Sequence, residues 1–338
     1  MGLQLNVVVL SLLLLFTSTT KAEVFDIVAK YQAKADGKTD ISTAPIEFKL
    51  QGTVMAPADP HFFKDPNWVV FNNIDISHCL EVELLMAKEQ QLGARTTALR
   101  TNIANHFQLF NFVTNAMIRD ITTKDSKQFN VNVLGCKNVT FEHFTVSNPE
   151  DSINTDGIHL GRSDGVYIQY SDIKTGDDCI SVGDGMKNLH VNGVSCGPGH
   201  GISVGSLGKF QGEGPIEGIF IKNCTITGTQ NGVRIKSWPA SYPGTASDMH
   251  FEDIKMDNVG NPILIDQEYC PWNLCNLKMP SKIKLSKISF KNIKGTCSTK
   301  EAVKLVCSSS HPCDNVELAN IDLTYKGPMD LQHLVVQM

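Results

Sequence analysis

The sequence predicts an all-β fold, a parallel β-helix in which short strands wind into stacked coils. Two observations carry this prediction. Polar motifs recur at a regular interval, with 22 residues from Asp156 to Asp178 and another 22 from Asp178 to His200. Runs that alternate apolar and polar residues recur along the same part of the chain, and alternation is the period of a strand. Such an interval is typical of a solenoid, whose units bury their apolar faces by stacking on one another.

Each run reads apolar, polar, apolar, two polar residues, apolar. The copies occupy residues 139–146, 166–173, 189–194, 219–226, 249–256, 283–290 and 316–323, and an earlier copy begins at Met117. The Asn and Asp residues inside the runs indicate sharp turns, because these residues tolerate left-handed backbone geometry. A β-sandwich with regular strands is the alternative. The variable spacing of the copies favours the solenoid, which absorbs insertions in loops on one side.

The composition is that of an ordinary globular chain, with 338 residues, 41% hydrophobic and 19% charged. The formal net charge is −5, and the sequence has no basic stripe. This balance argues against a nucleic-acid partner or any other polyanion held by bulk charge. An anionic ligand would therefore need a local cluster of basic side chains.

The N-terminus predicts export. An apolar run at residues 7–16 is too short to span a bilayer and is followed by polar residues up to Lys21. We interpret residues 1–22 as a signal peptide and residues 23–338 as a single β-helix domain. A membrane anchor is the alternative, but we expect a secreted protein with no membrane association after cleavage.

Ten cysteines fit an oxidising compartment. Six lie in pairs close in sequence, which predicts disulfides that staple loops: Cys179 with Cys196, Cys270 with Cys275, and Cys307 with Cys313. A zinc site is disfavoured because no Cys-x-x-Cys pair occurs. Two glycosylation acceptors occur, at Asn138 and Asn223, and either could instead be buried and unmodified.

Four motifs would line one groove of such a solenoid: Asn-Thr-Asp at 154–156, Gly-Asp-Asp-Cys at 176–179, Gly-His-Gly at 199–201 and Arg-Ile-Lys at 234–236. Stacked coils would gather three carboxylates, a histidine, an arginine and a lysine. Each motif also has a plain interpretation of its own. The paired aspartates could be a turn or a calcium ligand, Asn154 an internal ladder residue, the basic pair a solvated face, and Gly199 and Gly201 turn glycines. The joint occurrence favours a catalytic groove.

Together and in this order, the motifs resemble polygalacturonases, pectin-degrading hydrolases of glycoside hydrolase family 28 with a right-handed parallel β-helix. The resemblance covers about residues 110–325 and a shorter stretch at 44–73, and the segment 266–271 is similar to the plant branch, above all to pollen-type exopolygalacturonases. It implies an inverting, metal-independent enzyme without a cofactor, acting on the α-1,4-galacturonosyl linkages of de-esterified pectin. It also implies a monomer secreted into the plant cell wall.

Hydrolysis of a glycosidic bond needs one carboxylic acid to protonate the leaving oxygen and one carboxylate to activate water. The resemblance implies that Asp177 is the general acid and that Asp156 and Asp178 hold and deprotonate the water. Carboxylates on coils about 4.8 Å apart cannot all ionise without a large cost, so we expect one pKa to rise and that group to keep its proton.

Arg234 and Lys236 alternate with an apolar residue, so both face the same side of a strand. Two cations beside each other fit the carboxylate of a galacturonate unit. We expect His200 to hydrogen-bond an aspartate. The resemblance also implies substrate contacts from three further residues, Tyr269, Asn154 and Gly201.

Three regions depart from the family pattern. The start at 36–40 runs almost directly into 44–46, without the N-terminal capping helix and first strands that the family has between them. Residues 77–108 read as a helical, charged stretch, and residues 329–338 are also unlike the family. We interpret these regions as frame shifts in the gene model or as a decaying gene, which predicts a solenoid with a missing or disrupted N-terminal cap.

Other functions stay open at this point. Endo action on the same polymer is one, and a rhamnogalacturonan hydrolase is another, although the Arg-Ile-Lys motif favours galacturonate. A pectate lyase would need calcium and a basic group for elimination, which these motifs do not supply. A catalytically dead or wall-binding relic is the remaining alternative, because of the damaged N-terminus.

Overall fold

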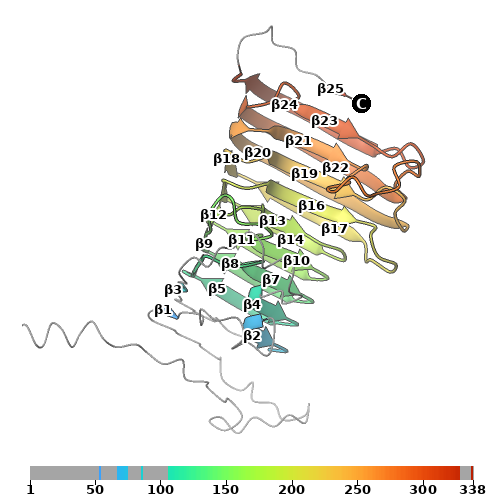
Figure 1. The fold of residues 1–338 in the computed structure, drawn as a ribbon. Coiled ribbons are helices and arrows are strands. Elements are labelled where there is room, and N and C mark those ends of the chain that lie inside the picture. The colour runs from blue at the N-terminus through green and yellow to red at the C-terminus, as the bar shows by residue number, and fades with distance from the viewer. Residues whose placement is uncertain (1–52, 55–66, 75–84, 87–105, 328–335, 338) are drawn as a thin grey trace, which may run out of the picture. The chain divides into compact units, whose positions relative to one another are not determined.

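The computed structural model describes residues 53–54, 67–74, 85–86, 106–327 and 336–337. The chain divides into residues 1–44 and 45–338, and every described residue belongs to the second unit. Each regular element in this described part is a strand, and the strand pairings are parallel (Figure 1). The predicted right-handed parallel β-helix is confirmed. The N-terminal cap lies outside the described residues.

Among the described residues, one sheet has ten strands, and each strand pairs with the strand of the neighbouring coil. Its members are β2 (Asn67–Asn72), β4 (His106–Asn111), β7 (Val131–Leu134), β10 (Ile158–Gly161), β13 (Asp178–Val182), β16 (Gly201–Leu207), β19 (Asn231–Ser237), β21 (Asn261–Asp266), β23 (Val303–Val306) and β25 (Val336–Gln337).

The other sheet has fifteen strands and covers the remaining sides of the coils. Its shorter members are β1 (Thr53–Val54), β3 (Leu85–Met86), β5 (Thr114–Arg119), β6 (Thr122–Lys124), β8 (Lys137–Glu142), β9 (Thr145–Ser147), β11 (Asp164–Gln169), β12 (Asp172–Lys174), β14 (Lys187–Asn192), β15 (Ser195–Cys196), β17 (Ile216–Lys222) and β18 (Thr225–Thr227). Its long members are β20 (Gly244–Val259), β22 (Ile283–Cys297) and β24 (Asp314–Tyr325). Both β17 and β18 pair with β20, so two strands of one coil continue as a single strand in the next.

The core runs through the middle of the coils as stacks of like residues. Ile158, Ile180 and Ile202 occupy paired positions in three neighbouring strands, and all three are fully buried. Because side chains alternate across a strand, each inward residue stacks on the inward residue of the next coil. The alternating pattern in the sequence is therefore the pattern of this core.

The turns inside the repeats have the left-handed geometry that the sequence predicts. Asn223, Asp253 and Asn320 follow corresponding apolar positions and have φ of 54°, 55° and 55°. Their side chains also form ladders between coils: Asn223 donates to the Asn192 side-chain oxygen over 2.8 Å, and Asp253 accepts from the Asn292 amide over 2.9 Å. Asn138 and Asn223 are both exposed, so the interpretation of either acceptor as buried is wrong.

Some details of the repeat differ from the prediction. Ala116, not Met117, faces the core, because it pairs with Val139 of the next coil. The copy at 283–290 is out of phase, since Ile288 pairs with Met249. The same order of apolar and polar residues begins at both Ile283 and Ile288 in β22, so the pattern alone does not reveal the correct frame. Of the stretch read as helical, the structure describes residues 85–86 and 106–108, which lie in strands β3 and β4.

The predicted disulfides Cys179–Cys196, Cys270–Cys275 and Cys307–Cys313 all form, and the free cysteines among the described residues are buried. Within the described ranges, no helix is both long and apolar enough to cross a membrane. The proposed signal peptide, most of residues 77–108 and most of 329–338 lie outside the described residues.

Gly295→Ala is expected to destabilise the protein much more than Gly228→Ala. Both glycines have positive φ, 131° and 62°, so each alanine meets backbone strain, which costs about 1–2 kcal/mol in the left-handed region. A Cβ at Gly295 would also fall on the carbonyl oxygen of Met256, whereas at Gly228 it meets open space. Thermal unfolding of the two variants compares these costs, and equal midpoints would contradict the close approach of β20 and β22.

Candidate active site

The four polar motifs lie on successive coils of the ten-stranded sheet. Asp156 stands two residues before β10, Asp178 opens β13, and His200 directly precedes β16. Arg234 and Lys236 lie within β19, one coil further. Parallel stacking thus brings the side chains of residues far apart in sequence to one place.

The turn before β10 is fixed by hydrogen bonds to its neighbours. The backbone oxygen of Asp156 accepts from both the backbone nitrogen and the side-chain amide of Asn130, over 2.8 and 3.1 Å. On the other side, the hydroxyls of Thr155 and Thr175 lie 2.9 Å apart. Asp156 is consequently held by the coil below and the coil above.

A β-bulge places the two neighbouring aspartates. Asp178 pairs with Gly201, but Ile180 pairs with Ile202, so Cys179 is an extra residue in β13. A bulge re-aims side chains that strict alternation would send to opposite faces. The equal 22-residue spacing predicts His200 in line with Asp178, yet the bulge sets it beside Asp177.

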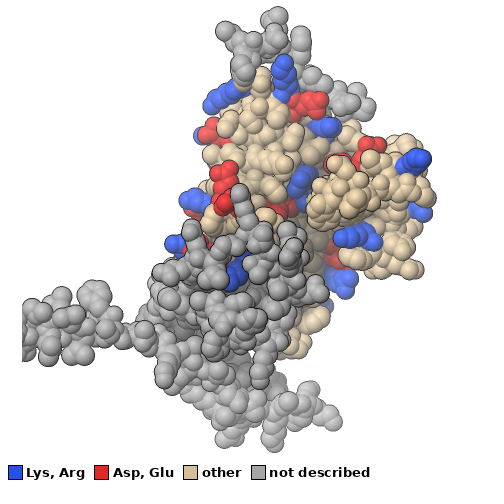
Figure 2. All heavy atoms as spheres, viewed as in Figure 1, with Lys and Arg blue, Asp and Glu red and all other residues tan. Residues whose placement is uncertain are grey.

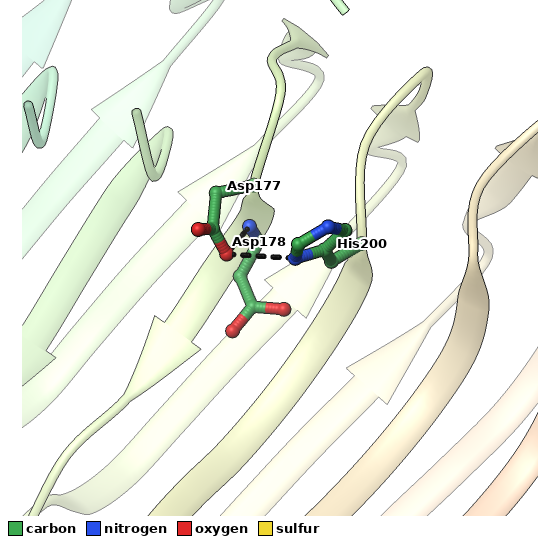
Figure 3. Close-up of side chains that lie close together, drawn as sticks. All are labelled: Asp177, Asp178 and His200. Atoms are coloured by element: carbon green, nitrogen blue, oxygen red, sulfur yellow. Dashed lines mark hydrogen bonds and ion pairs between the residues drawn. The ribbon is translucent and has the colours of Figure 1, made fainter. Parts of the chain in front are cut away.

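His200 hydrogen-bonds Asp177, with 2.9 Å between Nδ1 and Oδ1 (Figure 3). The backbone nitrogen of His200 also donates to the backbone oxygen of Asp177 over 2.7 Å. The Asp178 nitrogen donates to the same Asp177 carboxylate over 2.8 Å. The expected contact between the histidine and an aspartate is present, and its partner is Asp177.

Asp178 is the most heavily bonded of the three carboxylates. Its Oδ1 accepts from Arg234 Nη2 at 3.0 Å and from Ser203 Oγ at 2.7 Å, and its Oδ2 accepts from Lys236 Nζ at 2.8 Å. Arg234 and Lys236 are only 8% and 6% exposed, so the interpretation of this pair as a solvated face is wrong. One buried carboxylate thus faces two buried cations.

These surroundings separate the pKa values of two of the aspartates. Burial, together with the negative charges of Asp177 and Asp178, raises the pKa of Asp156 well above its ordinary value, and a hydrogen bond from Ser181 opposes this only in part. Burial acts on Asp178 in the same direction, but Lys236 and Arg234 outweigh it and lower its pKa to about 2. The ligand-free site therefore favours the protonated form of Asp156 and the ionised form of Asp178.

The three further residues proposed for substrate contacts lie around this cluster. The Tyr269 ring has Lys236 Nζ 5.2 Å and Arg234 Cζ 5.9 Å from its centre. Gly201 has φ of 87°, and a Cβ there would fall on the carbonyl oxygens of the next coil, so it is required by packing. Asn154 is exposed with φ of 57°, and the interpretation as an internal ladder residue is wrong.

Sequence reasoning missed two serines of the site. Ser203 is fully buried and bridges Asp178 and Arg234, accepting from Arg234 Nε at 3.1 Å. Ser181 contacts Asp156 and lies 2.8 Å from His159 Nδ1. The two serines occupy strand positions that are paired with each other and, for Ser203, with Arg234. The register between neighbouring strands was therefore the signal that could have found them, because each serine lies one coil away from a charged partner.

The paired aspartates, interpreted above as a possible calcium ligand, lie close to His200. One ligand atom from each of Asp177, Asp178 and His200 lies within 4.8 Å of the others. The Asp178 oxygens already accept from Arg234, Lys236 and Ser203, and Asp177 Oδ1 already contacts His200. The protein's own cations therefore provide the counter-charge that a metal would bring.

Charge elsewhere on the visible face is mixed. Figure 2 shows Lys and Arg interspersed with Asp and Glu rather than gathered into a field of one sign. This distribution agrees with the net charge of −5. An anionic ligand would thus be recognised by the local cations of the groove.

Comparison with known proteins gives a consistent picture. The family described as glycosyl hydrolases family 28 matches residues 18–336. A polygalacturonase of Gossypium barbadense is 50% identical, across 94% of this chain and 88% of that protein. An exopolygalacturonase of Oenothera organensis is 58% identical, across 83% of this chain and 79% of that protein.

Solved structures share the fold at low sequence identity. An endo-xylogalacturonan hydrolase from Aspergillus tubingensis has a TM-score of 0.69 at 21% identity, with 86% of this chain and 84% of that chain covered. An exopolygalacturonase from Thermotoga maritima has a TM-score of 0.59 at 14% identity, with 82% and 76% covered. The β-helix, the ordered motifs and the identity to plant polygalacturonases place this chain in glycosyl hydrolases family 28.

Proposed function

We infer that this chain hydrolyses the α-1,4-galacturonosyl linkages of de-esterified pectin by an inverting acid–base mechanism without a metal. The observation that carries this inference is the cluster in which Asp156, Asp177 and Asp178 meet the buried pair Arg234 and Lys236. Carboxyl groups supply the acid and base that glycoside hydrolysis requires. The cations supply a counter-charge for an acidic sugar.

In the proposed mechanism Asp177 protonates the leaving oxygen, while Asp156 and Asp178 position and deprotonate the attacking water. Asp177 is the outermost of the three, with a side chain 20% exposed against 3% for Asp178. The ligand-free cluster retains its proton on Asp156, so the mechanism needs that proton on Asp177 once substrate displaces solvent. The hydrogen bond between His200 and Asp177 would then assist the transfer of the Asp177 proton to the leaving oxygen.

Arg234 and Lys236 would bind the sugar carboxylate, with Tyr269 beside them. Arg234 and Lys236 both pair with the single charge of Asp178, so these three side chains together carry one net positive charge. Charge-assisted hydrogen bonds of this kind are stronger than neutral ones, especially in a site shielded from water. The proposed partner is thus a polymer with free carboxylates. Asn154, exposed on the turn before Asp156, would contact the polymer from that side.

Exo action is the finer proposal. It is supported by identity to proteins named exopolygalacturonase in Oenothera organensis and Platanus acerifolia. We also propose secretion into the plant cell wall as a monomer, with Asn138 and Asn223 exposed for glycosylation. Digestion of polygalacturonate tests the mode of action: monomer as the product throughout supports exo action, and a ladder of oligomers supports endo action. No release of reducing ends by a soluble, folded chain would support the relic instead.

Asp177→Asn and Asp156→Asn are expected to differ on a substrate that needs no acid. Removal of a general acid costs roughly 10²- to 10⁴-fold in rate when the leaving group must be protonated. Galacturonosyl fluoride has fluoride as its leaving group, and fluoride departs as an anion without protonation. Asp177→Asn should therefore recover most of its rate on this substrate. Asp156→Asn should remain impaired on both substrates, because it lacks the water-activating group. If Asp156→Asn alone recovered its rate on the fluoride, Asp156 would be the general acid and Asp177 the water-activating group.

Asp156→Asn is also expected to raise the melting temperature at neutral pH. The raised pKa means that the folded protein retains a proton that the unfolded chain releases above the ordinary value of 3.8. Stability that is present below that pH is therefore lost as pH rises toward the folded pKa. A neutral asparagine removes this loss, so the gain should disappear at about pH 3, where both states are protonated.

Differential scanning calorimetry across this pH range measures the effect. Asp151→Asn, at an exposed carboxylate on the loop before Asp156, is the matched control and should change the midpoint little at any pH. A midpoint for Asp156→Asn equal to that of the parent protein at neutral pH would show that Asp156 is not held in its protonated form.

A further inference from the structure

Aromatic side chains gather beyond the residues used above. Trp238 and Tyr242 lie on the loop after β19, Trp272 lies on the loop after β21, and Lys209 beside them lies on the loop after β16. These loops line a hollow of about 260 Å³ that includes Lys209, Trp238, Tyr242 and Trp272. No step of the proposed hydrolysis uses this hollow.

The hollow is connected to the catalytic cations by a chain of contacts. Tyr269, which lies over Lys236, meets Trp238 edge-on with ring centres 5.5 Å apart. Trp238 in turn stacks against Trp272, with ring centres 6.5 Å apart and an angle of 29°. A polymer held at Lys236 can therefore continue onto these rings without leaving the surface of the protein.

The loops hold these side chains in place. The Trp238 indole donates to Ser206 Oγ over 2.9 Å, and its backbone nitrogen donates to Leu207. Tyr242 donates through its backbone nitrogen to Gly208, which joins the first two loops. The disulfide between Cys270 and Cys275 closes the segment that carries Trp272. A prearranged surface loses less conformational entropy when a ligand binds.

The surface combines an exposed ring with an available cation. Trp272 is 69% exposed, and neighbouring apolar side chains of the hollow are also exposed. Apolar side chains gathered on a surface are typical of a binding site. Lys209 Nζ lies 5.0 Å from the Trp238 ring centre and forms no ion pair with any residue in the described part of the chain. A flat apolar face beside one ammonium group matches a sugar with an apolar C–H face and a carboxylate.

We propose that Lys209, Trp238 and Trp272 form a second galacturonate-binding subsite, at which a further sugar of the polymer stacks on Trp272 and pairs its carboxylate with Lys209. This proposal rests on the hydrolysis of galacturonan inferred above. It assigns these loops to the recognition of chain length: a polymer long enough to reach Trp272 gains a contact that a dimer does not have.

The test compares kcat/KM for hexagalacturonate with kcat/KM for digalacturonate. Trp272→Ala and Lys209→Gln should each lower this ratio roughly tenfold, the equivalent of about 1.4 kcal/mol of binding to the longer substrate. Trp272→Phe keeps a ring and should restore most of the ratio. Leu277→Ala and Lys278→Gln are the matched controls, because they alter exposed residues between β21 and β22 that do not line the hollow.

The outcomes separate the two proposals. If the parent protein cleaves neither oligomer, the proposed function fails and the subsite fails with it. If the parent protein cleaves both and all variants keep its ratio, the function stands and the subsite is overturned. A loss in Trp272→Ala without a loss in Lys209→Gln overturns the galacturonate assignment, because a neutral glycan would need the ring but not the cation.

Discussion

Parallel hydrogen bonding between successive coils determines where every side chain of the groove lies. Ile158, Ile180 and Ile202 share one inward position, and the outward positions beside them are in register for the same reason. Residues 31 apart, such as Ser203 and Arg234, meet because the extra length of the coil between them is absorbed in a loop. The site depends on this constraint, since no two of its coils are joined by side-chain packing alone.

One departure from register is as important as register itself. The bulge at Cys179 re-aims the neighbouring aspartates, and a disulfide joins Cys179 to Cys196 in β15 of the other sheet. Without the extra residue, Asp177 and Asp178 would alternate across the strand and only one would face the substrate. The conformation of one residue therefore decides how many carboxyl groups the site contains.

The buried charges favour function over stability. Asp178 is compensated by Arg234, Lys236 and Ser203, and removal of one partner from such a cluster would leave an unpaired charge in a poorly hydrated place. Burial and the charges of Asp177 and Asp178 raise the pKa of Asp156, and among the described residues Ser181 and Lys236 offset this only in part. The two carboxyl groups whose pKa values move in opposite directions, Asp156 and Asp178, are the two that we propose hold the attacking water.

Much of this was present in the sequence. Alternating runs determined the strands, turn residues such as Asn223 and Asp253 determined the left-handed bends, and short spacings determined the disulfide pairs, because all of these are local properties of the chain. Tertiary structure alone decided that His200 contacts Asp177, that the cations of the groove bind Asp178, and that Ser203 joins them. These depend on which residues of different coils come into register, and a bulge or loop insertion changes that register without a local signal. Tertiary structure also decided the contacts between the loops after β19 and β21. Their aromatic residues are far apart in sequence and meet only when the coils stack.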